Sequence, residues 1–587
     1  MAQAQIAVLD AGGQYCHLIA RKVRELGVSS AVFPSDVSLA ELTGVRGIII
    51  SGGPSSVYDH TSPSIDPAIL ASGTPVFGIC YGQQLIAHLL GGTVTPGDRG
   101  EFGLATLHPA STPSVILAGT EGPQQVWMSH RDLVAAPPRG FTVTGSTSTC
   151  PSAIIEDPVR RIFGVQFHPE VVHTRPGTQV LTNFIRGVCG CDSDWDPSQR
   201  VNLIHDQIRE RVGDRKVFFF VSGGVDSTVA FALCLDALGS ERVRGVYVDT
   251  GLMREGETEF VRETLASLGV VKIEYCQEEF LSALELVREP EVKRHIIGER
   301  FVAIQQRIID DWGLLSGKWI LGQGTIYPDT IESGATLRAA VIKTHHNRVP
   351  GIQKLMEAGL ILEPLADFYK DEVRAIGREL GLGPQLLERH PFPGPGLAIR
   401  CLCAETEVAV TRVPEGYLVP IHSVGVQGDS RSYAPVLAID TFPSAGARLQ
   451  DEATELVNRT AGINRVMARV ASREALHHQR VFPSTLTHGR LDLLRSADAI
   501  VRELSKESGF DSQVWQFPVI LIPLGAGESR ESVVLRPIQS IDGMTADAVV
   551  MPDVLLRQMA ERLLRLSDIA GVYYDLTHKP PGTIEWE

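Results

Sequence analysis

The segment Val217-Phe-Phe-Phe-Val-Ser-Gly-Gly-Val-Asp-Ser-Thr228 is the part of the chain that decides the fold. It begins with five apolar residues in a row, the pattern of a strand inside a sheet. A glycine-rich turn follows at residues 222–227, and residues 228–238 have the pattern of a helix. A strand, a tight turn and a helix in this order form the repeating unit of a doubly wound α/β domain.

The glycine-rich turn predicts an anion site, because such a turn presents consecutive N–H groups at the positive end of a helix. The lysine of the Gly-x-x-x-x-Gly-Lys-[Ser/Thr] P-loop is absent, and Asp226 is present instead. This indicates a loop that holds pyrophosphate through backbone and hydroxyl groups, with Asp226 available to bind Mg²⁺. The turn resembles the loop of enzymes that cleave ATP to AMP and pyrophosphate. We predict that ATP is bound by Ser222, Gly223, Gly224, Val225, Asp226 and Ser227.

The alternation continues beyond this segment. Further strands are predicted at residues 243–248, 271–275 and 319–321, with helices such as 257–268 between them. It ends at the Pro391-Phe-Pro-Gly-Pro-Gly396 turn, which no helix or central strand could contain. Residues 201–402 are therefore predicted to form a doubly wound ATP pyrophosphatase domain.

A second α/β domain is predicted at the N-terminal end of the chain, over residues 1–190. Apolar runs that predict the strands of a mainly parallel sheet alternate with helical patterns. The predicted strands are residues 6–9, 28–33, 47–50 and 76–79, and the predicted helices are residues 18–26 and 85–90. Acidic residues and turn formers then indicate a linker at residues 191–200.

Cys80 lies between a predicted strand and a predicted helix, flanked by Gly78 and Gly82. Small residues on both sides permit the sharp turn that exposes a nucleophile, and the N-terminus of the next helix favours a thiolate. A buried structural cysteine is the alternative for Cys80 alone. His168 and Glu170, late in the same domain, supply a base and a group that orients it, so we predict a Cys-His-Glu triad.

This first domain resembles the class I glutamine amidotransferases in four motifs that occur in the expected order. They are Ser51-Gly-Gly-Pro54, Gly78-x-Cys80-x-Gly82-x-Gln84, Ser129-His130-x-Asp132 and His168-x-Glu170. The resemblance implies that Cys80 attacks the glutamine γ-amide and that His168 protonates the departing ammonia. It also implies that the N–H groups of Gly53 and Tyr81 stabilise the oxyanion. The polar ends of glutamine would be held by Gln84, Ser129, His130 and Asp132.

The chain as a whole resembles the glutamine-hydrolysing GMP synthetase family. The resemblance rests on residues 293–298, 322–329, 342–347, 390–396 and 579–587. It implies that xanthosine 5′-monophosphate (XMP) attacks the α-phosphorus of ATP through its purine O2 and releases pyrophosphate, after which ammonia displaces AMP. The predicted XMP contacts are Arg294, Asp429, Arg431, Gln516, Lys579 and Glu585. Because Lys579 and Glu585 flank a turn near a chain end, substrate is expected to order this tail.

Residues 334–351 are polar and include Lys343, His345 and His346. We expect a lid that closes over the adenylylated intermediate and keeps water away from it. An ordinary surface loop is the alternative. One family position departs from its pattern nearby, since Ala366 stands where a lysine is common. Lys343 and Lys370 remain to contact phosphates.

The C-terminal part contains a repeat at a spacing of roughly 100 residues, which predicts two related α+β subdomains at residues 403–485 and 486–587. The family elements are divided between them, with Gly428-Asp-Ser-Arg431 in the first and Met544-Thr-Ala546 in the second. Gly543 replaces the aromatic residue common before Met544. This resembles the longer family form. We expect the two subdomains to pack as two chains' domains do in the short form's dimer, giving a monomer or a homodimer.

Composition excludes several classes of protein. The chain has 587 residues, 43% of them hydrophobic and 21% charged, as in soluble globular proteins. Its net charge of -15 argues against a nucleic-acid polymer or an anionic membrane as partner. The expected ligands are ATP, XMP and glutamine, as the family resemblance implies. Nine cysteines are too few for a disulfide framework. No apolar run has the length of a membrane span, and the N-terminus has no signal-peptide pattern, so a cytoplasmic location is expected.

Two other functions are weighed against this prediction. A different amidotransferase-fed ligase that forms AMP, such as glutamine-dependent NAD synthetase, would share the ATP loop and the triad. Residues 343–347 and 579–587 argue against it. A nucleotide-sensing scaffold with decayed sites is opposed by the intact Cys80, His168, Glu170, Asp226 and Ser227.

Overall fold

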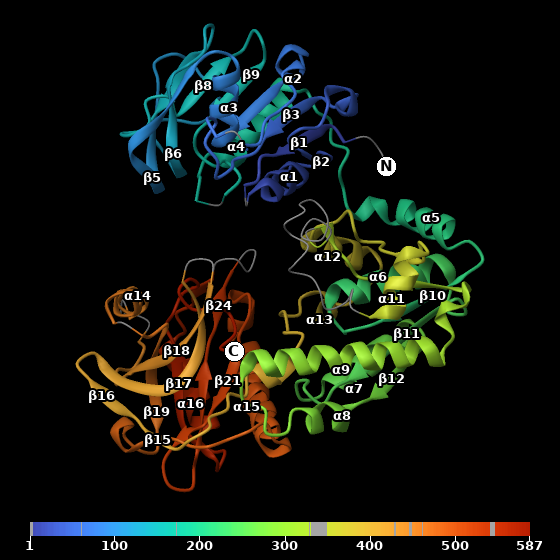
Figure 1. Cartoon of the computed structure of the whole chain (residues 1–587), viewed down its shortest axis with the longest axis vertical. Coiled ribbons are helices and arrows are strands. Elements are labelled where there is room, and N and C mark those ends of the chain that lie inside the picture. The colour runs from blue at the N-terminus through green and yellow to red at the C-terminus, as the bar shows by residue number, and fades with distance from the viewer. Residues whose placement is uncertain are drawn as a thin grey trace. The chain divides into compact units, whose positions relative to one another are not determined.

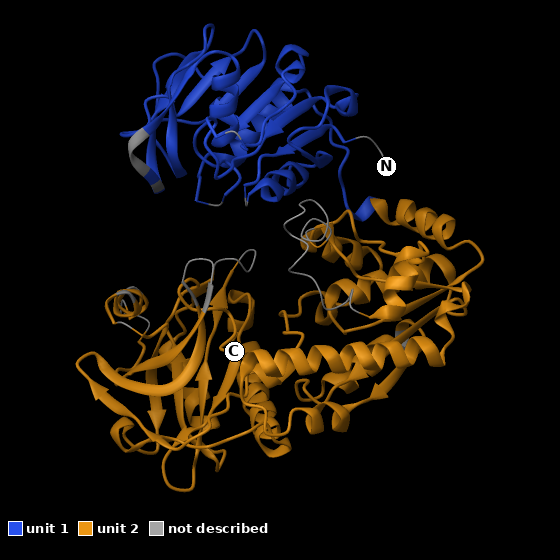
Figure 2. Ribbon diagram, in the orientation of Figure 1, with its two compact units in different colours: residues 1–199 blue, residues 200–587 orange. Residues whose placement is uncertain are grey.

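Figure 1 shows the chain in a computed structural model, which describes residues 4–13, 15–59, 61–171, 173–327, 329, 349–427, 430–444, 449–460, 462–540 and 546–587. The chain forms two compact units, Met1–Gln199 and Arg200–Glu587 (Figure 2). The division between them falls within residues 191–200, where the sequence predicts a linker.

The first unit contains a nine-stranded sheet in the order β2-β1-β3-β4-β9-β8-β7-β5-β6. The strands are β1 (Ile6–Asp10), β2 (Ser30–Pro34), β3 (Gly47–Ile50), β4 (Val76–Ile79), β5 (Thr93–Pro109), β6 (Gln124–Ala136), β7 (Thr142–Ser146), β8 (Ile154–Asp157) and β9 (Ile162–Val165). The five strands from β2 to β9 are parallel, and the other pairs are antiparallel. The parallel part agrees with the prediction from apolar runs.

Helices cover both faces of this sheet. They are α1 (Cys16–Glu25), α2 (Ala68–Ala71), α3 (Tyr81–Leu89) and α4 (Gly177–Thr182). Successive residues of a strand point to opposite faces. Ile6 of β1 accordingly belongs to the same buried cluster as Ile19 of α1, whereas Ala7 belongs to a second cluster with Leu85 of α3. This arrangement places the carboxyl end of β4 next to the start of α3.

The second unit begins with a five-stranded parallel sheet in the order β12-β11-β10-β13-β14. Its strands are β10 (Lys216–Phe220), β11 (Val243–Asp249), β12 (Val271–Tyr275), β13 (Trp319–Gly322) and β14 (Ile361–Leu362). Its helices are α5 (Val201–Val212), α6 (Val225–Leu238), α7 (Glu257–Leu268), α8 (Gln277–Ala283), α9 (Pro290–Asp311), α11 (Pro350–Glu357), α12 (Lys370–Glu379) and α13 (Pro384–Leu387). This is the predicted doubly wound architecture.

Two adjacent phenylalanines of β10 show why this sheet is covered on both faces. Phe219 packs edge-on against Phe231 of α6, with ring centroids 5.5 Å apart. Phe218 points the other way and contacts Trp312, which directly follows α9, at 5.4 Å. The continuous apolar run of β10 thus packs against a separate helical layer on each face of the sheet.

The C-terminal part of the second unit contains a seven-stranded sheet in the order β16-β17-β18-β19-β26-β23-β21. Its strands are β16 (Thr411–Val413), β17 (Gly416–Gln427), β18 (Ser430–Ile439), β19 (Arg465–Ser472), β21 (Val519–Ile522), β23 (Glu531–Leu535) and β26 (Ile569–Asp575). Short strands outside it are β15 (Val408–Ala409), β20 (Arg480–Val481), β22 (Leu524–Gly525), β24 (Ile538–Gln539) and β25 (Asp547–Ala548). The helices are α14 (Leu449–Arg459), α15 (His488–Glu507) and α16 (Asp553–Leu563).

This sheet has an internal repeat. The β17–β18 hairpin is followed by α14 and by β19, which runs parallel to β18. In the same way, β21 pairs antiparallel with β23, and α16 then leads to β26, which runs parallel to β23. The two last strands, β19 and β26, pair antiparallel at the centre of the sheet. The stretches predicted as subdomains therefore share one continuous sheet.

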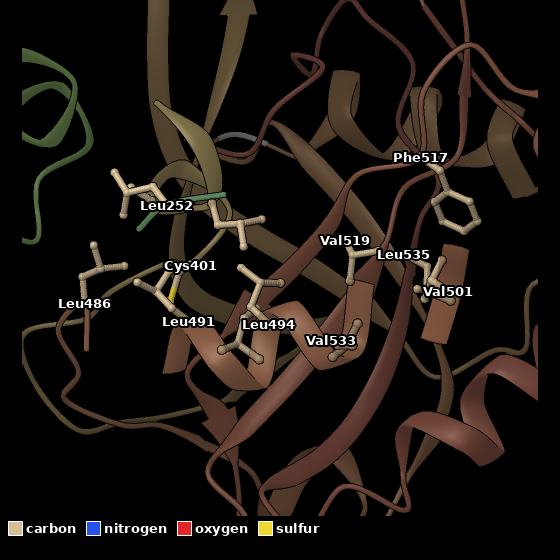
Figure 3. Packing of buried hydrophobic residues seen from close by; sticks show 14 of the residues in the cluster. Leu252, Cys401, Leu486, Leu491, Leu494, Val501, Phe517, Val519, Val533 and Leu535 are labelled. Atoms are coloured by element: carbon tan, nitrogen blue, oxygen red, sulfur yellow. The ribbon is translucent and has the colours of Figure 1, made fainter. Parts of the chain in front are cut away.

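Helix α15 packs on this sheet through a core shown in Figure 3. Leu491, Leu494 and Val501 of α15 belong to the same buried cluster as Val519 of β21. Leu252, which lies beyond β11, is part of this cluster as well. The core is therefore shared between the ATP pyrophosphatase domain and the C-terminal sheet. Among the helices of the described ranges, none combines the length and the apolar character that crossing a membrane requires.

Candidate active sites in the two units

Cys80 stands at a sharp turn between β4 and α3 in the first unit. Its backbone has φ 53° and ψ -108°, a conformation that residues other than glycine rarely adopt. A Cβ on Gly78 would lie 2.5 Å from the carbonyl of Gly82, and a Cβ on Gly82 would lie 2.4 Å from the Ile50 oxygen. Both glycines are therefore required by close backbone contacts. They give Cys80 the geometry of a nucleophile elbow.

The structure brings Cys80, His168 and Glu170 together. Cys80 and the His168 ring both lie against Gly52, and Cys80 is close enough to raise the pKa of the ring. On the other side of the ring, His168 Nδ1 lies 2.7 Å from Glu170 Oε1, and Glu170 is fully buried. Burial lowers the pKa of His168, but the Glu170 carboxylate and the Cys80 thiol outweigh it and raise the pKa to about 10. The ring therefore carries a proton at neutral pH, next to the nucleophile.

The two predicted oxyanion donors come from different parts of the chain, Tyr81 directly after the nucleophile and Gly53 on the loop after β3. Tyr81 is the first residue of α3, where backbone N–H groups have no partner within the helix. Gly53 belongs to the loop after β3, and a Cβ on its neighbour Gly52 would lie 2.9 Å from His168 Cε1 and 3.5 Å from Cys80 Cβ. This loop therefore packs directly against the nucleophile and its base. The oxyanion role of Gly53 and Tyr81 stays a prediction.

The predicted glutamine-binding residues lie around Cys80. The main-chain oxygen of Ser129 accepts a hydrogen bond from Cys80 Sγ at 3.6 Å. The Asp132 oxygen accepts from Gln84 Nε2 at 2.7 Å and lies 3.0 Å from His130 Nδ1. The structure thus gathers Gln84, Ser129, His130 and Asp132 into one network beside the nucleophile.

Three further residues of this network have no signal in the local sequence. Ser56 Oγ donates to Asp132 Oδ2 at 2.7 Å, and Gln84 Nε2 lies 3.2 Å from Gln166 Oε1. Glu101 pairs with His130 at 3.2 Å. These contacts join residues that are far apart in the chain, so only the folded structure brings them together.

The predicted ATP loop connects β10 to α6 in the second unit. Ser222 Oγ lies 3.0 Å from Ser227 Oγ, and the Gly224 N–H donates to Ser222 Oγ at 3.3 Å. Gly223 has φ +75°, which glycine adopts without strain. Its carbonyl accepts from Arg389 Nη1 at 3.1 Å, and Arg389 is in turn paired with Glu257. The loop is thereby fixed at the N-terminus of α6.

Asp226 has the properties expected of a Mg²⁺ ligand. Lys370 Nζ lies 3.2 Å from its Oδ2, whereas Oδ1 is buried and has no hydrogen-bond partner within the described ranges. A buried, unpaired carboxylate oxygen suits a cation. No cluster of three or more His, Cys, Asp or Glu side chains suited to a metal occurs in the part of the chain that the structure describes. Mg²⁺ is commonly held by one or two carboxylates together with substrate phosphates and water, and its binding at Asp226 stays a prediction.

Three of the predicted XMP residues, Gln516, Glu585 and Arg294, make contacts at the C-terminal tail. Gln516 Nε2 donates to the Pro391 oxygen at 2.9 Å and lies 3.5 Å from Glu585 Oε1. The Glu585 carboxylate accepts from Arg400 Nε at 2.9 Å and Nη2 at 2.7 Å. Arg294, on α9, donates to the main-chain oxygen of Glu587. These contacts bring Gln516 and Glu585 together and tie Arg294 to the same tail.

The remaining predicted residues are less fully defined. Lys579 pairs through its backbone with Ala546 at 2.7 Å. Asp429, Lys343, His345 and His346, and the side chain of Arg431, lie outside the described residues. The XMP site is therefore described only in part, and the lid prediction falls in a segment that the structure does not describe.

The C-terminal tail is held by the protein itself. Trp586 and Glu587 are buried, and Lys293 Nζ lies 2.6 Å from Glu587 Oε2. Arg465 and Arg536 donate to main-chain oxygens of residues 583–585. The expectation that substrate orders this tail is thus wrong, because buried cations already fix it.

Three family models match the chain. Glutamine amidotransferase class-I matches residues 7–188, NAD synthase matches residues 197–295, and the GMP synthase C terminal domain matches residues 503–586. The first covers the unit with the cysteine elbow, and the second covers the ATP loop. The third covers the second half of the C-terminal sheet, with β21, β23 and β26, and the tail up to Trp586.

Full-length relatives decide between the functions weighed above. The chain is 41% identical to a probable glutamine-hydrolyzing GMP synthase of Leptospira interrogans, with 99% of each chain covered. It is 40% identical to the glutamine-hydrolyzing GMP synthase of Streptomyces avermitilis, covering 99% of this chain and 98% of that one. It is 37% identical to that of Geobacillus kaustophilus, with all of both chains covered. The chain therefore belongs to the family of glutamine-hydrolysing GMP synthases.

Proposed function

We propose that this protein converts XMP to GMP with glutamine as nitrogen donor, cleaving ATP to AMP and pyrophosphate and forming an adenylyl-XMP intermediate. The observation that carries this proposal is the presence of two separate reaction centres in a chain that matches GMP synthases over its whole length. One centre has a Cys-His-Glu triad, and the other has a loop suited to pyrophosphate.

The first unit releases ammonia from glutamine. The Cys80 thiolate attacks the γ-amide carbon, and the oxyanion accepts hydrogen bonds from the N–H groups of Gly53 and Tyr81. His168, kept protonated by Glu170, gives its proton to the departing ammonia. Water then hydrolyses the thioester to glutamate with His168 as base. The close contacts of Gly52 support this assignment, since they keep the oxyanion loop next to the nucleophile.

The second unit activates XMP. The purine O2 attacks the α-phosphorus of ATP, the bond to the β-phosphate oxygen breaks, and pyrophosphate leaves into the loop at residues 222–227. Ammonia then attacks the activated purine carbon and AMP departs. Ser222, Ser227 and the N–H groups at the start of α6 hold the pyrophosphate. Mg²⁺, when bound, neutralises phosphate charge, and Asp226 Oδ1 is the oxygen available to it.

The XMP nucleotide is held by residues of the second unit. Gln516 and Glu585 form one side of the site, because their side chains already lie 3.5 Å apart. Arg294 supplies positive charge from α9, and Lys579, Asp429 and Arg431 complete the contacts. Lys343, His345 and His346 cover the intermediate and exclude water.

Two further observations support a proposal for the location and the assembly state. All nine cysteines are free thiols, which suits a reducing compartment such as the cytoplasm. The antiparallel pairing of β19 with β26 joins two similar halves within one chain, much as two subunits pair across a two-fold axis. We therefore propose a cytoplasmic enzyme that is active as a monomer.

A comparison of two acceptor substrates tests the proposed function. The enzyme is incubated with ATP, Mg²⁺ and glutamine, together with either XMP or deamido-NAD, and the products are separated by chromatography. GMP, AMP and pyrophosphate in equal amounts from XMP, with no NAD from deamido-NAD, is the expected result. NAD formation, or ATP hydrolysis without GMP, would contradict it.

A further inference from the structure

A buried carboxylate and imidazole pair lies beside the glutaminase nucleophile. Its imidazole, His130, is a predicted glutamine-binding residue, whereas its carboxylate, Glu101, has no role in the chemistry described above. Glu101 of β5 is the register partner of His130 on β6. Glu101 Oε2 lies 3.2 Å from His130 Nε2, and the side chains are 13% and 3% exposed. Such a pair is costly to bury unless its hydrogen bonds are satisfied.

The partners of His130 define how many protons the pair holds. Its Nδ1 faces the Asp132 carbonyl at 3.0 Å, and its Nε2 faces the Glu101 carboxylate. A neutral imidazole has one N–H and cannot donate to both acceptors. Both contacts are hydrogen bonds only when the pair shares one additional proton, either on the ring or on the carboxyl group. Burial holds the pKa of His130 below its usual value, and the Asp132 carbonyl and the Glu101 carboxylate offset that effect only in part.

Glu101 also connects a third segment. Thr147 Oγ1 lies 3.0 Å from Glu101 Oε1 and 3.1 Å from Oε2, and donates its hydrogen to this carboxylate. The Cys150 N–H donates to Thr147 Oγ1 at 3.0 Å, which closes a turn. One carboxylate thus ties β5, β6 and the 147–150 turn together.

The ring of His130 in turn fixes the main chain that faces Cys80. The Asp132 carbonyl bonded to His130 is the one that accepts from Gln84 Nε2 at 2.7 Å. The Ser129 carbonyl, directly before His130, accepts from Cys80 Sγ at 3.6 Å. Rotation of the ring would release the Asp132 carbonyl and allow residues 129–132 to shift relative to the nucleophile.

We propose that Glu101 is a positioning residue of the glutaminase. It holds the His130 ring and thereby sets the main chain of residues 129–132 against Cys80 and the glutamine substrate. Glu101 contacts neither the nucleophile nor its base in the structure and acts through His130. This inference rests on the proposed hydrolysis of glutamine.

Replacement of Glu101 separates this role from a general structural one. In Glu101→Ala, His130 Nε2 and Thr147 Oγ1 lose their buried partner, so kcat/KM for glutamine should fall by about tenfold or more, chiefly through KM. In Glu101→Gln, the amide donates to Nε2 and accepts from Thr147, so most of the activity should return. GMP formation from saturating ammonia should stay within about twofold of wild type in both variants, because the ATP loop belongs to the second unit.

Glu41→Ala is the matched control. Glu41 lies in the same unit and is exposed, and its hydrogen bonds are local contacts with Ser38. Steady-state rates of glutamate release and GMP formation are measured for all four proteins. Near-normal glutamine kcat/KM in Glu101→Ala, no recovery in Glu101→Gln, or a parallel loss of ammonia-supported activity would each overturn the proposal. If the wild type itself hydrolyses no glutamine, the proposed function fails. If the wild type is active and Glu101→Ala is equally active, only the positioning role of Glu101 fails.

Discussion

Glu170 Oε1 lies 2.7 Å from His168 Nδ1, and the carboxylate is shielded completely from solvent. This contact decides the protonation state of the glutaminase base. The pKa of His168 is raised from 6.5 to about 10, so the protonated ring stabilises the fold fully below about pH 6.5, and this contribution is lost as the pH rises towards 10. The proton that ammonia needs is therefore present across the neutral range.

Glu170→Gln removes the charge that keeps His168 protonated. Because the pKa of His168 then falls, the alkaline limb of the kcat/KM profile for glutamine should move to lower pH. The maximal rate should also fall, by about 10²- to 10⁴-fold, as when the carboxylate of a catalytic triad is neutralised. Initial rates of glutamate release between pH 6 and pH 10.5 measure both effects. An unchanged alkaline limb would show that Glu170 does not hold the proton on His168.

Asp226→Asn tests the proposed Mg²⁺ ligand. The amide keeps the shape of the side chain but removes its negative charge, so GMP formation should fall by about 10- to 100-fold with either nitrogen source. The Mg²⁺ concentration needed for half-maximal rate should rise. Asp236→Asn on the same helix is the control, because Asp236 is exposed and pairs with His205. Equal Mg²⁺ dependence in the two variants would exclude Asp226 as the ligand.

Asp575→Asn tests what holds the C-terminal tail. Asp575 Oδ2 lies 2.8 Å from Arg465 Nη1, 2.7 Å from Arg536 Nη1 and 2.8 Å from Trp586 Nε1. The variant leaves two buried guanidinium groups without their counter-ion, so the free energy of unfolding should fall by about 3–5 kcal/mol. Denaturant unfolding of the second unit measures the change. Asp568→Asn, at an exposed position near the start of β26, should have little effect.

The ion pairs of Asp575 with Arg465 and Arg536 also make the stability of the protein depend on pH. Burial acts to raise the pKa of Asp575, but Arg536 and Arg465 outweigh it and hold the pKa below the ordinary value of 3.8. Its contribution to stability is therefore complete above pH 3.8 and is lost as the pH falls below that value. The wild type should lose stability in this acidic range more steeply than Asp575→Asn. Parallel pH profiles for the two proteins would contradict the assignment.

Local patterns predicted the elements that carry the two reaction centres. The strands at residues 47–50 and 76–79 occur where the apolar runs place them, because both are buried along their whole length. The elbow at Cys80 follows from glycines at fixed offsets, and the ATP loop follows from a glycine-rich turn after a strand. In each case the chemistry is encoded within about ten consecutive residues.

Contacts made through the register of distant strands could not be predicted in this way. Glu101 and His130 are 29 residues apart and meet only because β5 and β6 pair with a shifted register between Pro96 and Glu101. The C-terminal tail is fixed by Arg465 and Arg536, which lie far from it in the sequence. Its sequence suggests a fraying end, because the buried cations that hold it come from elsewhere in the chain.

The division of labour between the two units is tested most directly by Cys80→Ala. GMP formation from XMP and ATP is measured for the variant and the wild type, first with glutamine and then with ammonium chloride as nitrogen source. The variant should form no GMP from glutamine, since it has no nucleophile, and should match the wild type with ammonia. Loss of both activities, or GMP formation from glutamine without Cys80, would contradict the account.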